Sequence, residues 1–274
     1  MSEVHECLLE TLYCLDDICR RNSIDYYLIG GSLLGAVRYG DLIPWDDDVD
    51  VQMTRENFDK LLALPDSEFP EGFGVIDPKG KDERHVFLPQ FANYNHKVPM
   101  RKVEGHEEEE YGDITLDIFV LDETRNKMTR KIQSLIFIYL QLIDENFFNY
   151  REKVHLHRSY LPIYYTLKGL AKISSLFLKP DRVIKLHRFF CKMYNGKNCK
   201  YCFPSDSMTY WLIFETKWYV GEPATVKLRD RDIYTMNGYI DYMIYEYGED
   251  YMTPPPVEER VTQHCDIELD IPVE

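Results

Sequence analysis

The stretch that decides the fold reads YLIGGSLLGAVR at residues 27–38, and IPWDDDVDV follows at residues 43–51. Residues 26–29 form a short apolar run that ends in Gly30, Gly31 and Ser32. The next apolar residues recur at helical spacing, so the pattern predicts a strand, a tight turn and a helix. Such a helix start presents backbone N–H groups and the positive end of its dipole. The turn therefore predicts a phosphate-binding site, in which Ser32 either caps the helix or donates a hydrogen bond to phosphate.

The acidic residues of the second stretch have the spacing of metal ligands. Asp48 and Asp50 alternate with Val49 and Val51, so on a strand both carboxylates lie on one face while the valines face the core. Adjacent carboxylates repel each other unless a cation lies between them, and their oxygens suit Mg²⁺ or Mn²⁺. Asp46 lies on the same side if the strand begins early, and we include it among the predicted metal ligands.

Two other interpretations of the acidic run are weaker. A calcium-binding EF-hand loop that began at Asp46 would need Gly at its sixth position and Glu at its twelfth. This chain has Val51 and Asn57 there, so that interpretation fails. A plain solvated loop would also explain four aspartates in five positions. The Gly-Gly-Ser turn just upstream favours a functional site instead.

A third carboxylate lies in an apolar segment. Residues 114–121 read ITLDIFVL, which is a buried-strand pattern with Asp117 as its single acidic residue. A charged side chain is seldom buried unless it is paired or bound to metal. Asp117 is therefore a candidate third ligand, and a salt bridge to a nearby Arg or Lys is the structural alternative.

These segments resemble the LicD family, named for bacterial enzymes that move phosphocholine from CDP-choline onto cell-surface glycans, with fukutin-related ribitol-phosphate transferases as distant relatives. The family pattern combines GG-S/T-LLG-x-x-R, IPWDDDxD, D-I-F and a late YG-x-x-Y-x-x-PP-x-x-x-R-x-x-H. The chain matches the first three blocks at residues 30–38, 43–50 and 117–119. It also has the residues of the late block in order, at Tyr247, Gly248, Pro254, Pro255, Arg260 and His264. It departs from the pattern at Tyr39, where the family usually has His.

The resemblance implies an α+β nucleotidyltransferase (polymerase-β-like) fold, a small mixed sheet with helices, in which Asp48, Asp50 and Asp117 are catalytic. It also implies a metal-dependent enzyme that transfers a phosphocholine-like group from a CDP-activated donor to a hydroxyl of a glycan or lipid-linked glycan. Which phosphorus the acceptor attacks stays open. A nucleotidyltransferase and a glycosyltransferase with an Asp-x-Asp motif are alternatives, although the latter would need more than the 45 residues that precede Asp46. A non-catalytic nucleotide-binding protein would not need Asp117.

The resemblance also assigns substrate-binding residues outside the carboxylates. Arg38 would neutralise charge near the leaving nucleotide, and Arg260 and His264 would contact substrate, with a structural role as an equal alternative for Arg260. Residues 236–248 have the pattern of a turn and a helix that Gly248 ends. The prolines at 254–256 then form a stiff spacer.

Length and cysteine content limit the class of protein. The chain has 274 residues, of which 45% are hydrophobic, and seven cysteines. We expect one enlarged domain with reduced thiols and a cytoplasmic location, because no apolar run spans a membrane and no basic leader precedes the first helix. His187, Cys191, Cys199 and Cys202 could supply four zinc ligands. Core packing is the alternative, and we assign no zinc site.

The formal charge of −15 is unevenly distributed. Residues 125–200 contain sixteen Lys or Arg and four acidic residues, so they carry +12 and the rest carries −27. Apolar residues recur at helical spacing from Leu161 to Leu178. We therefore predict a catalytic core at 1–124, a basic helical insert at 125–205 and a C-terminal part at 206–274 that packs on the core. The insert would face the acceptor or the inner membrane surface, or would simply balance charge. The acidic catalytic half argues against nucleic acid as a partner.

Overall fold

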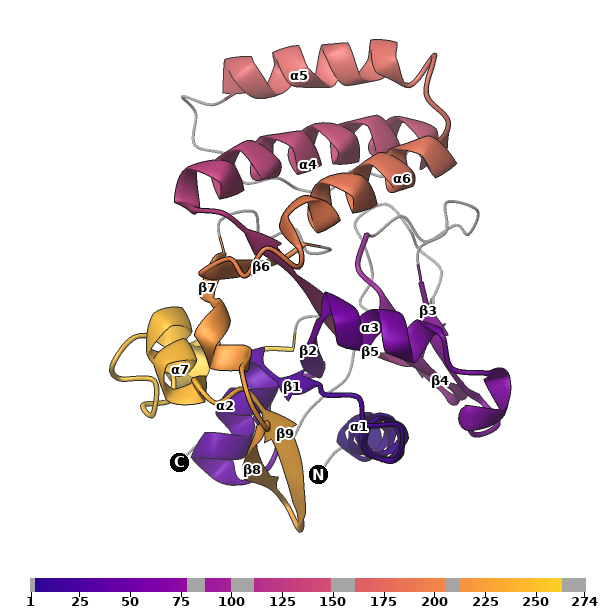
Figure 1. Cartoon of the computed structure of the whole chain (residues 1–274). Helices are drawn as coiled ribbons and strands as arrows, with labels where there is room; N and C mark the ends of the chain where they lie inside the picture. Colours follow the sequence, from indigo (N-terminus) through magenta and orange to yellow (C-terminus); the bar gives the residue numbers. More distant parts are fainter. Residues whose placement is uncertain (1–2, 78–86, 100–110, 149–160, 206–211, 263–274) are drawn as a thin grey trace. The chain divides into compact units, whose positions relative to one another are not determined.

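The computed structural model describes residues 3–77, 87–99, 111–148, 161–205 and 212–262 (Figure 1). The chain divides into two compact units. The first consists of Met1–Ile76, Pro89–Leu121 and Lys217–Glu274, and the second of Asp77–Leu88 and Asp122–Thr216. The three-part division drawn from the sequence stays a prediction. In the described ranges, none of the helices combines the length and the apolar character that crossing a bilayer requires.

The first unit is built on a mixed β-sheet. Its strand order is β1 (Tyr27–Leu28), β2 (Asp50–Thr54), β5 (Tyr111–Thr124), β4 (Gln90–Pro99) and β3 (Phe73–Ile76). The pair β2 and β5 is parallel, whereas the other neighbours are antiparallel. The expected mixed sheet with helices is therefore confirmed. The strand β5 runs on into the second unit from Asp122.

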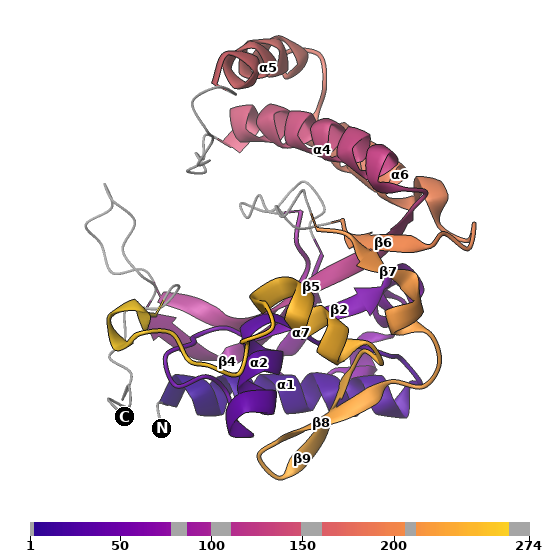
Figure 2. The same cartoon turned by 90° about the vertical axis from the view of Figure 1, so that its left-hand side faces the viewer.

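Helices and a hairpin complete the first unit (Figure 2). The helices are α1 (Glu3–Arg21), α2 (Gly30–Tyr39), α3 (Arg55–Leu62) and α7 (Tyr239–Tyr247), and the hairpin pairs β8 (Ala224–Leu228) with β9 (Arg231–Thr235). Three short 3₁₀ helices are η1 (Asp66–Glu68), η4 (Thr216–Tyr219) and η5 (Val257–Glu259). The helix α1 contacts β4 and buries apolar residues at helical spacing, including Leu8, Leu12 and Leu15. This spacing places one apolar face of α1 against the core.

The predicted order of strand, turn and helix is confirmed, with two corrections at its boundaries. The helix α2 begins at Gly30 with Ile29 as its N-cap residue. Ser32 is thus the third residue of the helix, and the prediction that it caps the helix was wrong. The strand β2 begins only at Asp50, so Asp48 precedes the strand instead of lying in it. The helix end at Gly248, which has a φ of 87°, is confirmed.

The second unit contains three helices in its described part, α4 (Lys127–Phe148), α5 (Leu161–Ser174) and α6 (Pro180–Cys191). The 3₁₀ helix η3 (Lys192–Tyr194) and the antiparallel strands β6 (Tyr201–Pro204) and β7 (Phe214–Glu215) follow. The helix α4 contacts both α5 and α6. Their core includes Leu140, Ile143, Ala171 and Val183. The helical pattern predicted for this basic segment is therefore confirmed over α5.

Three of the four candidate zinc ligands, His187, Cys191 and Cys202, are buried in this unit, whereas Cys199 is partly exposed. The ring of His187 stacks on Phe87 at a centroid distance of 4.3 Å, and Cys191 Sγ lies 3.5 Å from His187 Nδ1. Cys202 Sγ donates to the backbone oxygen of Phe214 at 4.0 Å. The described residues hold no group of three or more His, Cys, Asp or Glu side chains arranged to bind a metal ion. Core packing, the alternative to a zinc site, accounts for these contacts.

Candidate active site

Hydrogen bonds through backbone and hydroxyl groups connect the start of α2 to the start of β2. The Ile29 N–H donates to Asp50 O at 3.2 Å, and the Asp50 N–H donates to Ser32 Oγ at 3.1 Å. The Gly30 N–H donates to the hydroxyl of Tyr242 on α7 at 3.2 Å. The predicted phosphate turn thus lies beside the first residue of the acidic strand.

The glycines of this turn allow two carboxylates to approach the helix. A Cβ atom on Gly30 would lie 3.0 Å from Asp50 Oδ2, and Gly30 has a φ of +59°, which side chains rarely adopt. A Cβ atom on Gly31 would overlap Asp46 Oδ2. Further along α2, a Cβ on Gly35 would lie 2.6 Å from Asp41 O. The motif therefore needs glycine because the acidic loop packs directly against the helix.

Asp50 and Asp117 are neighbours across the parallel strands. They are partners in the register of β2 and β5, so their side chains project from the same face of the sheet. The Gln90 side chain donates from Nε2 to Asp117 Oδ1 at 2.7 Å. The acidic loop before β2 is held by His5, whose ring nitrogen Nε2 lies 2.7 Å from Asp46 O. The structure thus brings two of the predicted catalytic residues, Asp50 and Asp117, together.

The electrostatics of the site centre on Asp50. Burial raises the pKa of the Asp50 carboxyl well above its usual range, and the negative charges of Asp48, Asp117 and Asp46 raise it further. The negative charge of the site also acts on Tyr247 of α7. Burial raises the pKa of the Tyr247 hydroxyl, and the charges of Glu246, Asp46, Asp50 and Asp48 raise it further. Like charges gathered in this way attract a cation. Within the described ranges, no group of three or more His, Cys, Asp or Glu side chains is placed to hold a metal ion. The full set of metal ligands therefore stays a prediction.

The late motif lies against the first one. Arg38 donates from Nε to Tyr251 O at 2.8 Å, and its Nη2 donates to the same oxygen. The Arg260 guanidinium lies over the Trp45 ring, 4.8 Å from its centroid, and its Nε donates to Pro255 O at 3.0 Å. These contacts bring two of the predicted substrate-binding residues, Arg38 and Arg260, to the segments around the acidic run. The third, His264, lies outside the described residues.

Comparison with known proteins explains why these motifs occur together. The LicD/FKTN/FKRP family, described as a nucleotidyltransferase domain, matches residues 23–161. This range holds the glycine turn, the acidic run and Asp117, and it covers half of the chain. The chain belongs to the LicD family.

Two relatives of the LicD-family chain carry functional names. Lipopolysaccharide cholinephosphotransferase LicD of Haemophilus influenzae is 27% identical over 255 residues, which are 90% of this chain and 89% of the relative. Ribitol 5-phosphate transferase FKRP of Homo sapiens is 35% identical over 94 residues, which are 32% of this chain and only 18% of that relative. Both are named as transferases of a phosphate-bearing group. The expectation of a LicD-type phosphotransferase is confirmed at the level of the family.

Several contacts of this LicD-family site could not be assigned from the sequence motifs. Tyr242 accepts the Gly30 N–H, Gln90 binds Asp117, and Trp45 stacks on Arg260. The density of tyrosines just before Gly248 was the available signal for α7. No comparable signal marked Gln90, because a single amide in a strand has no distinctive pattern.

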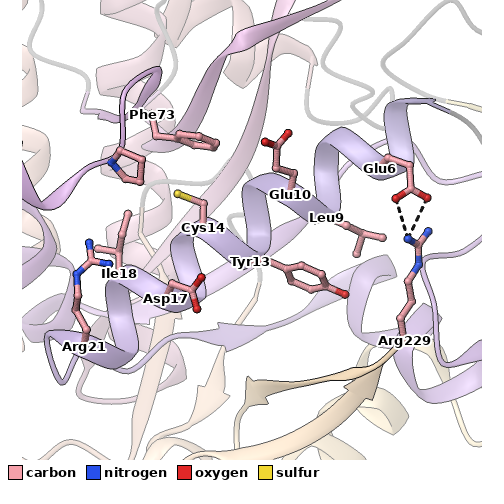
Figure 3. A pocket seen from close by; sticks show the side chains of 11 residues that line it. Glu6, Leu9, Glu10, Tyr13, Cys14, Asp17, Ile18, Arg21, Phe73 and Arg229 are labelled. Atoms are coloured by element: carbon pink, nitrogen blue, oxygen red, sulfur yellow. Dashed lines mark hydrogen bonds and ion pairs between the residues drawn. The ribbon is translucent and has the colours of Figure 1, made fainter.

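A groove runs along α1 (Figure 3). It has a volume of about 540 Å³, and Tyr13, Cys14 and Phe73 are among the side chains that line it. At one end Arg229 donates from Nη1 to Glu6 Oε1 at 3.0 Å. None of the predicted site residues of this LicD-family chain lines the groove.

Proposed function

We propose that this chain is a Mg²⁺- or Mn²⁺-dependent transferase with a nucleotidyltransferase (polymerase-β-like) fold. It moves a phosphocholine-like group from a CDP-activated donor to a hydroxyl of a cell-surface glycan, and it acts in the cytoplasm. One observation carries the proposal. Asp50 lies opposite Asp117 on the parallel strands β2 and β5, and its backbone N–H donates to Ser32 Oγ at the start of α2 at 3.1 Å.

The residues at the site have the type of ligand atom that a divalent cation prefers. All four predicted ligands are carboxylates, whose hard oxygens Mg²⁺ and Mn²⁺ prefer over nitrogen or sulfur. Asp50 and Asp117 already share one face of the sheet. The bound ion would supply positive charge to neutralise the diphosphate of the donor.

The remaining groups would position the donor. The Gly30 N–H is used by Tyr242, so in this proposal the later N–H groups of the helix start, at Gly31 and Ser32, bind phosphate oxygens. Arg38 is oriented by two hydrogen bonds to Tyr251 O. The rest of its guanidinium would neutralise charge near the leaving nucleotide. One of the site carboxylates would accept the proton of the attacking hydroxyl.

A screen of CDP-linked donors with a glycan acceptor tests this proposal. Phosphocholine-like transfer releases CMP, whereas nucleotidyl transfer would place CMP on the acceptor and release the alcohol phosphate. Mass spectrometry of the acceptor distinguishes the two outcomes. We expect CMP release that needs Mg²⁺ or Mn²⁺ and stops in EDTA.

Two variants sharpen the screen. Asp48→Asn should abolish metal-dependent CMP release while the protein stays folded. Asp113→Asn is the matched control, because Asp113 lies on β5 four residues before Asp117 and pairs with Lys97. Undiminished activity of Asp48→Asn, or CMP release that persists in EDTA, would overturn the metal assignment.

A further inference from the structure

The turn between α5 and α6 exposes large apolar side chains. Leu176 is 76% exposed and Phe177 is 78% exposed. On α5, Leu170 and Ile173 are also exposed, and on α6 so is Phe189. Single exposed apolar residues are common on protein surfaces, but a contiguous group usually marks an interaction site.

The core of the second unit does not account for these residues. The helix α5 packs into that core with Leu167 and Ala171, and Leu178 joins them after the helix. The exposed residues Leu170 and Ile173 are therefore additional to the face that the fold buries. The segment carries apolar residues on two faces, and only one of them is covered by the described residues.

The same segment is strongly basic in an otherwise acidic chain. Residues 161–192 contain seven Lys or Arg and one acidic residue, Asp181. Lys168 lies 3.8 Å from Glu145. Lys172, Lys179 and Lys185 are exposed and make no ion pair with another described residue. Positive charge beside exposed apolar side chains is the composition of a helix that binds at a lipid interface.

We propose that this surface binds an anionic lipid bilayer, with Leu176 and Phe177 inserted among the lipids. The membrane-binding surface comprises Leu170, Lys172, Ile173, Leu176, Phe177, Lys179 and Lys185. Its lysines complement anionic headgroups. A polyanionic glycan would satisfy the lysines but would leave the aliphatic side chains in water, so the lipid surface fits both parts. The inference goes beyond the transferase function and does not depend on it.

Sedimentation with lipid vesicles tests the proposal on the full chain. We expect binding to vesicles of phosphatidylcholine and phosphatidylglycerol, weakened by salt, and none to phosphatidylcholine alone. The double variant Leu176→Ser/Phe177→Ser should lower the affinity by at least about tenfold for each side chain removed. Lys172→Glu/Lys185→Glu should lower it by at least about fivefold for each lysine.

Matched variants in the first unit serve as controls. Val220 is 65% exposed, and the Lys227 side chain is 61% exposed and lies 3.3 Å from Asp232. Val220→Ser and Lys227→Glu therefore replace an exposed apolar side chain and an exposed lysine elsewhere, and both variants should bind vesicles as the unaltered chain does. CMP release from a soluble donor should be unchanged in all four variants. This readout separates failure of the membrane inference from failure of the proposed enzyme.

A second measurement guards against variants that fail to fold. Phe177→Trp keeps an aromatic side chain at the turn, and its fluorescence should shift to shorter wavelength when anionic vesicles are added. The inference is overturned if Leu176→Ser/Phe177→Ser binds vesicles normally while folded, or if the emission of the introduced tryptophan does not move. It is also overturned if the surface binds soluble dextran sulfate or a second copy of the chain and not vesicles.

Discussion

Replacement of Asp50 by Asn should make the metal-free protein more stable and inactive at the same time. The Asp50 carboxyl is buried beside Asp48, Asp117 and Asp46, and burial and these charges together raise its pKa well above its usual range. Asn has nearly the same shape and no charge. The substitution therefore removes an unfavourable charge and keeps the packing, but it also removes a predicted metal ligand.

The sign of the effect follows from proton linkage. In the unfolded chain the pKa of an Asp is about 3.9, and in the folded chain the pKa of Asp50 is higher. Between these values the folded protein holds a proton that the unfolded chain has lost, so the free energy of unfolding falls as pH rises through that window. Above the window, the charged Asp50 lowers the free energy of unfolding by about 1.4 kcal/mol for each unit by which its pKa in the folded chain exceeds that in the unfolded chain. Above the window, the free energy of unfolding of the variant should exceed that of the unaltered chain by that amount. Below about pH 4 the two free energies should converge.

Urea unfolding in EDTA, repeated over a range of pH, measures the difference. Addition of Mg²⁺ should reduce this difference in the free energy of unfolding, because it should bind the unaltered chain and not the variant. A ligand at 100 times its Kd stabilises the folded state that binds it by about 2.7 kcal/mol. Asp113→Asn is the control, since its carboxylate pairs with Lys97 and lies outside the predicted ligand set. A variant at Asp50 that is less stable than the unaltered chain above the window, or that still releases CMP, would refute the reasoning.

Three further predictions test the site and the groove along α1. Tyr242→Phe removes the acceptor of the Gly30 N–H, and because an unpaired buried donor costs about 1–3 kcal/mol, the urea midpoint should fall; an unchanged midpoint would contradict this hydrogen bond. Asp117→Asn should lower kcat by orders of magnitude, while a structural role would lower stability and leave kcat per folded molecule normal. Burial and then the charge of Asp17 raise the pKa of the Cys14 thiol to about 11, so its alkylation by iodoacetamide, followed by mass spectrometry, should be slow at neutral pH and rise toward that pH; fast alkylation at neutral pH would contradict it.

Local spacing was enough to predict the elements that carry the site. A strand, a glycine turn and a helix follow from residues 26–38, because apolar periodicity is a property of consecutive residues. Ser32 does not cap the helix, which was one of the two roles predicted for it, because the N-cap residue is Ile29, three residues earlier. Glycine has no side chain to accept a helix N–H, and Ser32 is the first residue of the turn with a hydroxyl group, but the helix begins without a side-chain cap.

The spacing of residues along the chain did not predict the contacts between distant segments. The hydrogen bond between Tyr242 and Gly30 joins residues 212 positions apart, and that between Arg38 and Tyr251 joins residues 213 apart. The register that pairs Asp50 with Asp117 was likewise not fixed by any pattern in the chain. The family resemblance implied that these carboxylates act together, but it did not indicate Tyr242 as a partner of the turn.

Two of the groups that contact this site are neutral. Gln90 binds Asp117 through a neutral amide, and Tyr242 binds the Gly30 N–H through a hydroxyl whose own pKa is raised by burial. Neutral partners fix geometry, whereas a cationic partner would also lower the pKa of the carboxylate it met. Asp50 instead keeps a raised pKa, which costs stability in the metal-free chain. Binding of the proposed cation and charged substrate would explain why the fold retains such a cost at one point.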